Sequence, residues 1–287
     1  MNITTIFFYI IWDVNSDIFT IPYVDHPVKW YGIAWALGFL VGQQIMYYIY
    51  RRDGRDSKEV DTLTLYILFA GFLGARLGHF LFYDPGVFLS DPLQIVLPPY
   101  AGLASHGGGI GVLIAVYFFA RRTNSSYLWV VDRLAIVTAL AGCFIRLGNL
   151  MNSEMIGIPT NVPWAFVFTA VDDIPRHPAQ LYEAIYSLLL FLLLFGIWYK
   201  KGNGLNNGFV TGLFLIIMFS LRFFDEFLKI DQSEFESGML INMGQILSIP
   251  YMMLGIWILW MSRRNENRKI LFEDSADEKA ETNPGKI

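Results

Sequence analysis

Residues 129–150 read WVVDRLAIVTALAGCFIRLGNL. A helix needs about 20 mostly apolar residues to cross a bilayer, so this stretch is long enough to span a membrane once. Six further stretches of similar composition occur along the chain. They cover residues 30–50, 62–83, 106–121, 179–199, 208–228 and 241–262. The sequence therefore predicts an all-α integral membrane protein with seven transmembrane helices.

The composition supports this class. Of the 287 residues, 54% are hydrophobic and only 16% are charged, whereas about a quarter of the residues in a soluble domain are charged. The single cysteine, Cys143, lies inside an apolar stretch. The chain therefore has no disulfide framework and no cysteine-based metal site. We expect neither a metal nor a nucleic-acid partner.

The basic residues between the apolar stretches predict the orientation, because cytoplasmic loops of membrane proteins are enriched in Lys and Arg. Twelve such residues fall on one side of the membrane. They are Arg51, Arg52, Arg55, Lys58, Arg121, Arg122, Lys200, Lys201, Arg263, Arg264, Arg268 and Lys269. The other side carries three, which are Lys29, Arg176 and Lys229. This bias places the N-terminus outside and the C-terminus in the cytoplasm.

The segments outside the helices are predicted from their composition. Residues 1–29 include the apolar run 5–12, with no basic residue before it and no small-residue cleavage site after it. We therefore expect an outer, interfacial N-terminal segment rather than a signal peptide. Residues 30–262 form the transmembrane body, with a short outer head at about 152–177. Residues 263–287 are polar and acidic, which predicts a disordered cytoplasmic tail.

Polar and charged groups gather at the outer ends of the predicted helices. This layer holds Tyr31, Arg76, His106, Arg146, Asn149, Asn152, His177, Gln180, Tyr182, Glu183, Arg222, Glu226, Asn242 and Gln245. Any one arginine at a helix end can simply snorkel to the interface. The layer as a whole is typical of a site for an anionic headgroup, because the planar guanidinium fork binds phosphate oxygens two at a time.

Arg222 and Glu226 are four residues apart, so they share one helix face. Their simplest role is an intrahelical ion pair, which lowers the cost of placing both charges in a membrane. The same pair would also orient the guanidinium toward a phosphate.

The run Ser105–Gly111 (SHGGGIG) is the most unusual local feature. Consecutive glycines weaken a helix, so we expect a broken or re-entrant start to the third span. They are tolerable where another backbone or a ligand must come close, and an unhindered backbone would offer N–H groups to an anion or a lipid ester. Histidine is suited to proton transfer near neutral pH, which makes His106 a candidate base, although a histidine beside glycines is more often structural.

The chain resembles the prolipoprotein diacylglyceryl transferase family. Seven short motifs carry the resemblance, in the family's order and across nearly all of residues 29–262. They are Lys29–Gly32 (KWYG), Gly74–Gly78 (GARLG), Ser105–Gly108 (SHGG), Arg146–Glu154 (RLGNLMNSE, with Gly157 just beyond), His177–Glu183 (HPAQLYE), Leu221–Phe227 (LRFFDEF) and Met243–Pro250 (MGQILSIP).

The resemblance implies an activity and a location. Members of this family transfer the diacylglyceryl group of phosphatidylglycerol to the lipobox cysteine thiol of a prolipoprotein, which forms a thioether and releases glycerol phosphate. The partners implied are phosphatidylglycerol, lipobox-containing prolipoproteins and membrane lipid, with no cofactor. The implied location is the bacterial cytoplasmic (inner) membrane, with a multi-pass fold and an active site toward the outer, periplasmic side.

The resemblance also assigns roles to individual residues. The implied catalytic residues are Tyr31, His106, Arg146 and Arg222, with His106 as the base for the substrate thiol. The implied phosphatidylglycerol-binding residues are Arg76, Gly107, Gly108, Arg146, Asn149, Glu154, Gly157, Arg222, Glu226 and Gln245. Of these, Arg146 and Arg222 are expected to hold the lipid phosphate, and Glu226 is expected to pair nearby.

Two other functions remain open at this level. A transporter for an anionic solute or lipid would need polar groups that continue into the cytoplasmic half of the helices, where we find only Asp132 and Arg133. A lipid-binding scaffold would keep the arginines but would show no turnover.

Overall fold

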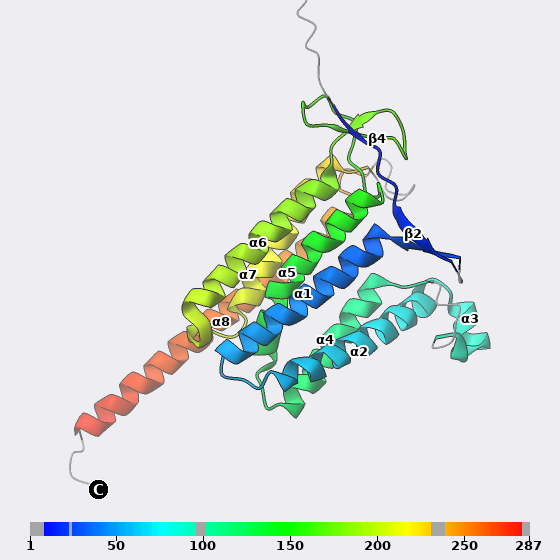
Figure 1. The fold of residues 1–287 in the computed structure, drawn as a ribbon. Coiled ribbons are helices and arrows are strands. Elements are labelled where there is room, and N and C mark those ends of the chain that lie inside the picture. The colour runs from blue at the N-terminus through cyan, green and yellow to red at the C-terminus, as the bar shows by residue number, and fades with distance from the viewer. Residues whose placement is uncertain (1–8, 23–24, 96–101, 231–238, 283–287) are drawn as a thin grey trace, which may run out of the picture. The chain divides into compact units, whose positions relative to one another are not determined.

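The computed structural model describes residues 9–22, 25–95, 102–230 and 239–282, and helices dominate it (Figure 1). The long helices are α1 (Trp30–Arg52), α2 (Lys58–Phe82), α4 (Ser105–Arg122), α5 (Tyr127–Met151), α6 (Ala179–Lys201), α7 (Phe209–Asp225) and α8 (Met243–Thr282). The short ones are α3 (Pro85–Ser90) and three 3-10 turns, η1 (Pro92–Ile95), η2 (Gly202–Gly204) and η3 (Glu226–Leu228).

Each long helix coincides with one of the predicted apolar stretches. Among the described residues, five helices are long and apolar enough to cross a membrane, namely α1, α2, α5, α6 and the Met243–Arg264 part of α8. The other two are shorter, with 18 residues in α4 and 17 in α7. The mostly helical, membrane-type architecture predicted from the sequence is therefore confirmed.

Short strands complicate the all-α prediction. They are β1 (Ile10–Trp12), β2 (Asp17–Ile21), β3 (His26–Lys29), β4 (Phe166–Phe168) and β5 (Pro175–Arg176). β1 pairs in parallel with β4, and β5 pairs antiparallel on the other side of β4, while β2 and β3 form a separate hairpin. The N-terminal segment, which we expected simply at the interface, thus contributes a strand to the head predicted at about residues 152–177 (Figure 1). The apolar residues of β1 and β4 are mostly β-branched or aromatic, which suits a strand pair.

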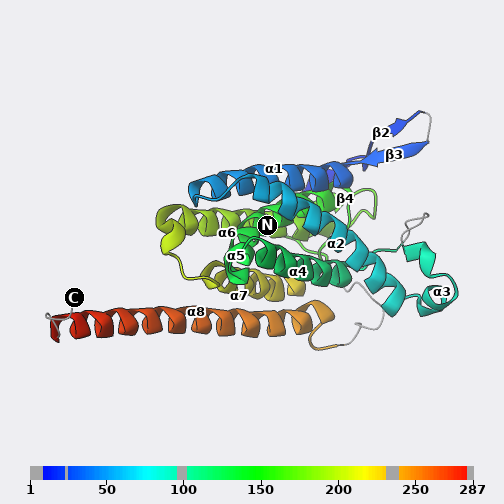
Figure 2. The same cartoon turned by 90° about the horizontal axis from the view of Figure 1, so that it is seen from below.

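Helix α8 continues to Thr282, beyond the predicted end of the last span and into the tail that we expected to be disordered (Figure 2). Residues 263–282 contain no Pro or Gly and many Glu, Lys, Arg and Ala residues. These are helix-forming residues, so an α-helix can continue once α8 has started. The helix ends two residues before Pro284. The structure gives residues 263–282 a helical conformation, and the disorder expected for the tail stays a prediction.

The chain forms two compact units. The first contains Met1–Gly42 and Ala135–Ile287, and the second contains Gln43–Leu134. Of the residues predicted for the site, Arg76, His106, Gly107 and Gly108 belong to the second unit, and the others belong to the first. Each unit is described by itself below.

The glycines of α4 explain how the second unit packs. A Cβ atom on Gly107 would meet the carbonyl oxygen of Gly74 in α2, and a Cβ on Gly111 would meet the carbonyl oxygen of Ala70. Small residues four apart allow two membrane helices to approach at backbone distance. The expected break in this segment was wrong, because α4 runs continuously from Ser105 and its glycines are used for helix packing.

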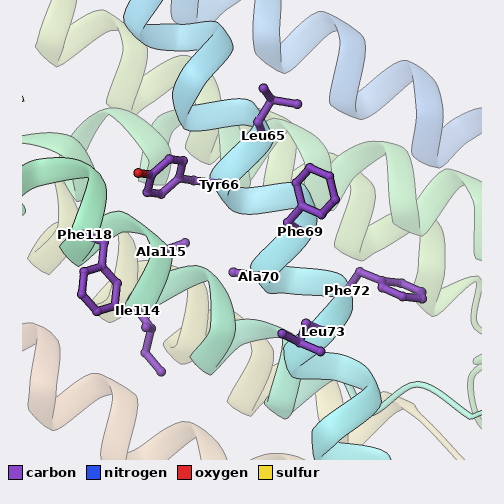
Figure 3. A pocket seen from close by; sticks show the side chains of 9 residues that line it. All are labelled: Leu65, Tyr66, Phe69, Ala70, Phe72, Leu73, Ile114, Ala115 and Phe118. Atoms are coloured by element: carbon purple, nitrogen blue, oxygen red, sulfur yellow. The ribbon is translucent and has the colours of Figure 1, made fainter. Parts of the chain in front are cut away.

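Helices α2 and α4 also line an apolar pocket of about 750 Å³ (Figure 3). Its lining consists almost entirely of apolar side chains, which are Leu65, Tyr66, Phe69, Ala70, Phe72 and Leu73 from α2 and Ile114, Ala115 and Phe118 from α4. Large exposed apolar side chains on helices of this length are expected where lipid is the solvent.

Candidate functional site

A buried lysine organises the polar cluster of the first unit. The Lys229 ammonium lies 2.7 Å from Glu183 Oε1, and 3.2 Å from both Asp225 Oδ2 and Glu226 Oε1. Only 2% of the lysine side chain is exposed, and the three carboxylate side chains are exposed by 1–6%. Buried charges are tolerated when they are paired in this way.

Two arginines extend from this cluster. Arg146 Nη1 lies 2.7 Å from Glu183 Oε2, and Arg222 Nε lies 3.7 Å from Glu226 Oε1. Their side chains are 21% and 39% exposed, respectively, so both guanidinium groups are more accessible than the carboxylates that hold them. With Lys229, the cluster contains three cations and three carboxylates, and the charges balance. The accessible groups of the cluster are therefore its two arginines.

Sequence spacing creates half of this cluster. Asp225 and Glu226 lie three and four residues after Arg222, and Lys229 lies four and three residues after them, just beyond η3. This spacing places the four side chains on one helix face. The predicted ion pair between Arg222 and Glu226 is confirmed. The other half comes from different helices, because Glu183 lies near the start of α6 and Arg146 lies near the end of α5.

Gly157 makes backbone contacts with both the head and Lys229. Its backbone N–H donates to the carbonyl of His177 at 3.0 Å, and it forms an antiparallel bridge with Lys229. A Cβ at this position would lie 2.7 Å from the carbonyl oxygen of Leu228 and would also meet the backbone of His177. Gly157 is thus required for close backbone packing beside the cluster.

Asn149 and Glu154 form a second polar group at the end of α5. Asn149 Nδ2 donates to Glu154 Oε2 at 3.3 Å, and Asn152 Nδ2 donates to Glu154 Oε1 at 3.1 Å. The side chain of Gln180 donates to the backbone carbonyl of Glu154. Ser153, at φ 53°, lies on one side of Glu154, and Met155, at φ 58°, lies on the other. Non-glycine residues rarely adopt this left-handed conformation, so the surrounding bonds must hold the turn.

Tyr31 and Gln245 support the cluster from other helices. The backbone and ring of Tyr31 pack against Gly148 in α5, where a Cβ would lie about 3.0 Å from the ring. Gln245 and Asn242 close the start of α8, since Gln245 N donates to Asn242 Oδ1 and Asn242 N donates to Gln245 Oε1. This reciprocal arrangement is a capping box. Asn242 Nδ2 also donates to Glu226 Oε2 at 3.3 Å, which links the cap to the cluster.

The outer head predicted from the sequence is held by its own ion pair. Arg176 Nη2 lies 2.6 Å from Asp172 Oδ2, and this hydrogen-bonded pairing holds the pKa of the Asp172 carboxyl below its usual range. Burial lowers the pKa of His177, whose Nδ1 lies 3.1 Å from the hydroxyl of Tyr182. Burial therefore favours the neutral form of His177.

Arg76, in the second unit, is almost fully buried at 1% exposure. Its guanidinium donates to the backbone carbonyls of Gln94, Ile95 and Gly102, and it lies 4.8 Å from the ring centre of Phe80. These contacts fix the chain after α2. Arg76 thus holds this connection, and its predicted part in lipid binding stays a prediction.

His106 lies in the first turn of α4 and is exposed. Its ring centre is 5.4 Å from that of Phe82 and 6.0 Å from that of Tyr83. The next residue, Gly107, faces α2 at backbone distance, and a Cβ on Gly108 would lie 3.3 Å from the carbonyl oxygen of Gly71. The glycines thus fix the start of the helix on which the accessible histidine stands.

Sequence reasoning missed the central member of the cluster. It counted Lys229 as a loop cation, included Asp225 only within a motif, and placed Glu183 in the polar layer without naming its partners. The spacing Asp225-Glu226-x-x-Lys229 was a usable signal, because it puts two carboxylates and an amine on one helix face. No local pattern pointed to Glu183 as the shared partner of Arg146 and Lys229.

Comparisons with known proteins identify the family of the chain. The family model described as prolipoprotein diacylglyceryl transferase matches residues 17–261. A protein of Tolumonas auensis named phosphatidylglycerol–prolipoprotein diacylglyceryl transferase is 45% identical, covering 88% of this chain and 98% of the relative. Proteins with the same name from Bacteroides fragilis and Chloroherpeton thalassium are 42% and 41% identical, over 90% and 88% of this chain and 97% and 94% of the relatives. The chain therefore belongs to the prolipoprotein diacylglyceryl transferase family.

Proposed function

We propose that this protein transfers the diacylglyceryl group of phosphatidylglycerol to the lipobox cysteine thiol of a prolipoprotein. Membership of the family supports the reaction class. The observation that carries the proposal is that Arg146 and Arg222, from different helices, are both accessible and are both anchored to one buried cluster. Two guanidinium groups held in this way suit a single phosphate.

The proposed reaction is a displacement at the glyceryl carbon that carries the phosphate ester. The thiolate sulfur forms a bond to this carbon, and the bond between the carbon and the phosphate oxygen breaks. The thiol proton leaves to a base, and glycerol phosphate departs with the bonding electrons. Arg146 and Arg222 stabilise the charge that develops on the leaving phosphate, an effect that is strongest where water is excluded.

The other predicted residues of the first unit act around this phosphate. Glu226 orients Arg222, and Asn149, Glu154, Gly157 and Tyr31 shape the surroundings of Arg146 within the first unit. Gln245 acts indirectly. It holds Asn242 through the capping box, and Asn242 in turn binds Glu226. Gly107 and Gly108 support the start of α4, where His106 stands.

The proposed membrane arrangement follows from the loop charges. All seven long helices cross the bacterial cytoplasmic membrane, with the N-terminus outside and the C-terminus inside. The cluster then lies toward the outer face, where exported prolipoproteins and the outer leaflet are accessible. Four basic residues between the apolar parts of α1 and α2, and four that follow the apolar part of α8, support this orientation.

The proposed base can be tested separately from the arginines. If His106 removes the thiol proton, His106→Asn should slow transfer by about 100-fold, since general base catalysis contributes roughly 10²–10⁴-fold. The dependence of kcat on pH should also lose the limb that reports the base. His79→Asn is a matched control, because His79 packs on Tyr83 in the same unit but has no proposed catalytic role. A pH profile for the His106 variant that matches that of the original protein would exclude His106 as the base.

The function itself is tested by mass spectrometry. Purified protein is incubated with phosphatidylglycerol and a synthetic lipobox peptide, and we expect the peptide to gain the mass of one diacylglyceryl group. An unmodified peptide, together with retained lipid, would indicate a lipid-binding scaffold. Net movement of lipid or anion across sealed vesicles without peptide modification would indicate a transporter instead.

A further inference from the structure

Lys229 joins the carboxylates that hold the two arginines. Its ammonium lies 2.7 Å from one oxygen of Glu183, whose other oxygen lies 2.7 Å from Arg146. The same ammonium lies 3.2 Å from Glu226 Oε1, the oxygen that pairs with Arg222 at 3.7 Å. A continuous series of ion pairs therefore runs from Arg146 on α5 to Arg222 on α7 through this one amine.

The backbone and surroundings of Lys229 are also fixed. Lys229 forms a backbone bridge with Gly157, and Ile158 N donates to the carbonyl of Leu228 at 2.9 Å. The side chain is 2% exposed, so water cannot replace the carboxylates around the ammonium without a change in structure. The position of Lys229 is thus fixed at its backbone and at its ammonium group.

We propose that Lys229 is a positioning residue for the transfer reaction, which fixes Glu183 and Glu226 and, through them, the guanidinium groups of Arg146 and Arg222. The inference rests on the proposed function. Without the ammonium, two arginines would face three buried carboxylates, and the cluster would carry an excess negative charge. The carboxylates would then draw the guanidinium groups toward themselves, which weakens their binding to a lipid phosphate.

Asp225 provides a way to separate charge balance from positioning. It pairs with Lys229 at 3.2 Å, and no arginine within the described residues pairs with it. Asp225→Asn therefore removes one negative charge and leaves both arginine anchors intact. Combined with Lys229→Met, it restores the charge balance of the cluster but leaves Glu183 and Glu226 without the amine that joins them.

The experiment measures kcat and KM for phosphatidylglycerol, together with thermal stability in detergent, for four variants. Lys229→Met should raise KM by about tenfold or more, as expected when one partner of a buried charge pair is removed. Lys229→Arg, which keeps the charge, should recover much of this loss. Asp225→Asn alone gives the reference KM and stability against which the double variant is compared. The double variant should recover thermal stability but retain the raised KM.

Two results would overturn the inference. One is a normal KM in Lys229→Met, or in the double variant if the single variant does not fold. The other is recovery of KM in the double variant, because charge balance alone would then explain the effect. Retention of phosphatidylglycerol by each purified variant, measured by native mass spectrometry, separates this inference from the proposed function. A protein that shows no transfer but loses lipid on Lys229→Met would refute the function and support the positioning role.

Discussion

Replacement of Arg146 with alanine is expected to reduce diacylglyceryl transfer by at least about 100-fold, the loss typical when one preorganised donor to a developing anion is removed. Arg146 is partly exposed and is held by Glu183 at 2.7 Å, so its guanidinium is both accessible and oriented. Alanine removes the charge and the donors together. Transfer to a lipobox peptide, measured by mass spectrometry in the purified variant, gives the rate.

A matched arginine variant shows whether this loss is specific. Arg121, in the last turn of α4, is exposed and donates to the hydroxyl of Tyr117 at 3.1 Å. Arg121→Ala removes the same side chain without touching the cluster, so it should leave transfer close to normal. Arg146→Lys should fall between the two, because an ammonium keeps the charge but not the planar fork. Near-normal transfer by Arg146→Ala would exclude Arg146 from the phosphate site.

The second large effect is expected in the second unit, where Gly107→Ala should destabilise the protein. The new Cβ would meet the carbonyl of Gly74 and would lie 2.8 Å from the Cα of Gly78, so α2 and α4 would have to separate. Overpacking of this kind costs about 1–3 kcal/mol. We expect a lower thermal unfolding temperature in detergent and a smaller amount of folded protein in the membrane.

Gly109→Ala is the control for this variant, because it makes the same change two residues away on the same helix. A Cβ at Gly109 would meet nothing within 4 Å, and alanine favours a helix over glycine by about 1 kcal/mol. This variant should be as stable as the original protein or slightly more stable. Equal stability of the Gly107 and Gly109 variants would contradict the close approach of α2 and α4.

The glycines of α4 show why part of the site could not be predicted. Three consecutive glycines are compatible with an open backbone that faces a ligand and with a helix that packs against another backbone. The sequence leaves both possibilities open, and in the structure Gly107 and Gly111 face α2. The deciding information is the identity of the neighbouring helix, and Gly74 and Gly78 are about thirty residues away in the sequence.

The helices themselves followed directly from the order of the amino acids. A long apolar stretch must satisfy its own backbone hydrogen bonds in lipid, so each one forms a helix whatever its neighbours are. The Arg222–Glu226 ion pair could also be predicted from the sequence, because its two residues are four positions apart on one helix. The partners of the buried lysine were not, because Lys229 and Glu183 are 46 residues apart and belong to different elements. Such a pair depends on how helices pack, and packing alone turned separate charged residues into one connected cluster.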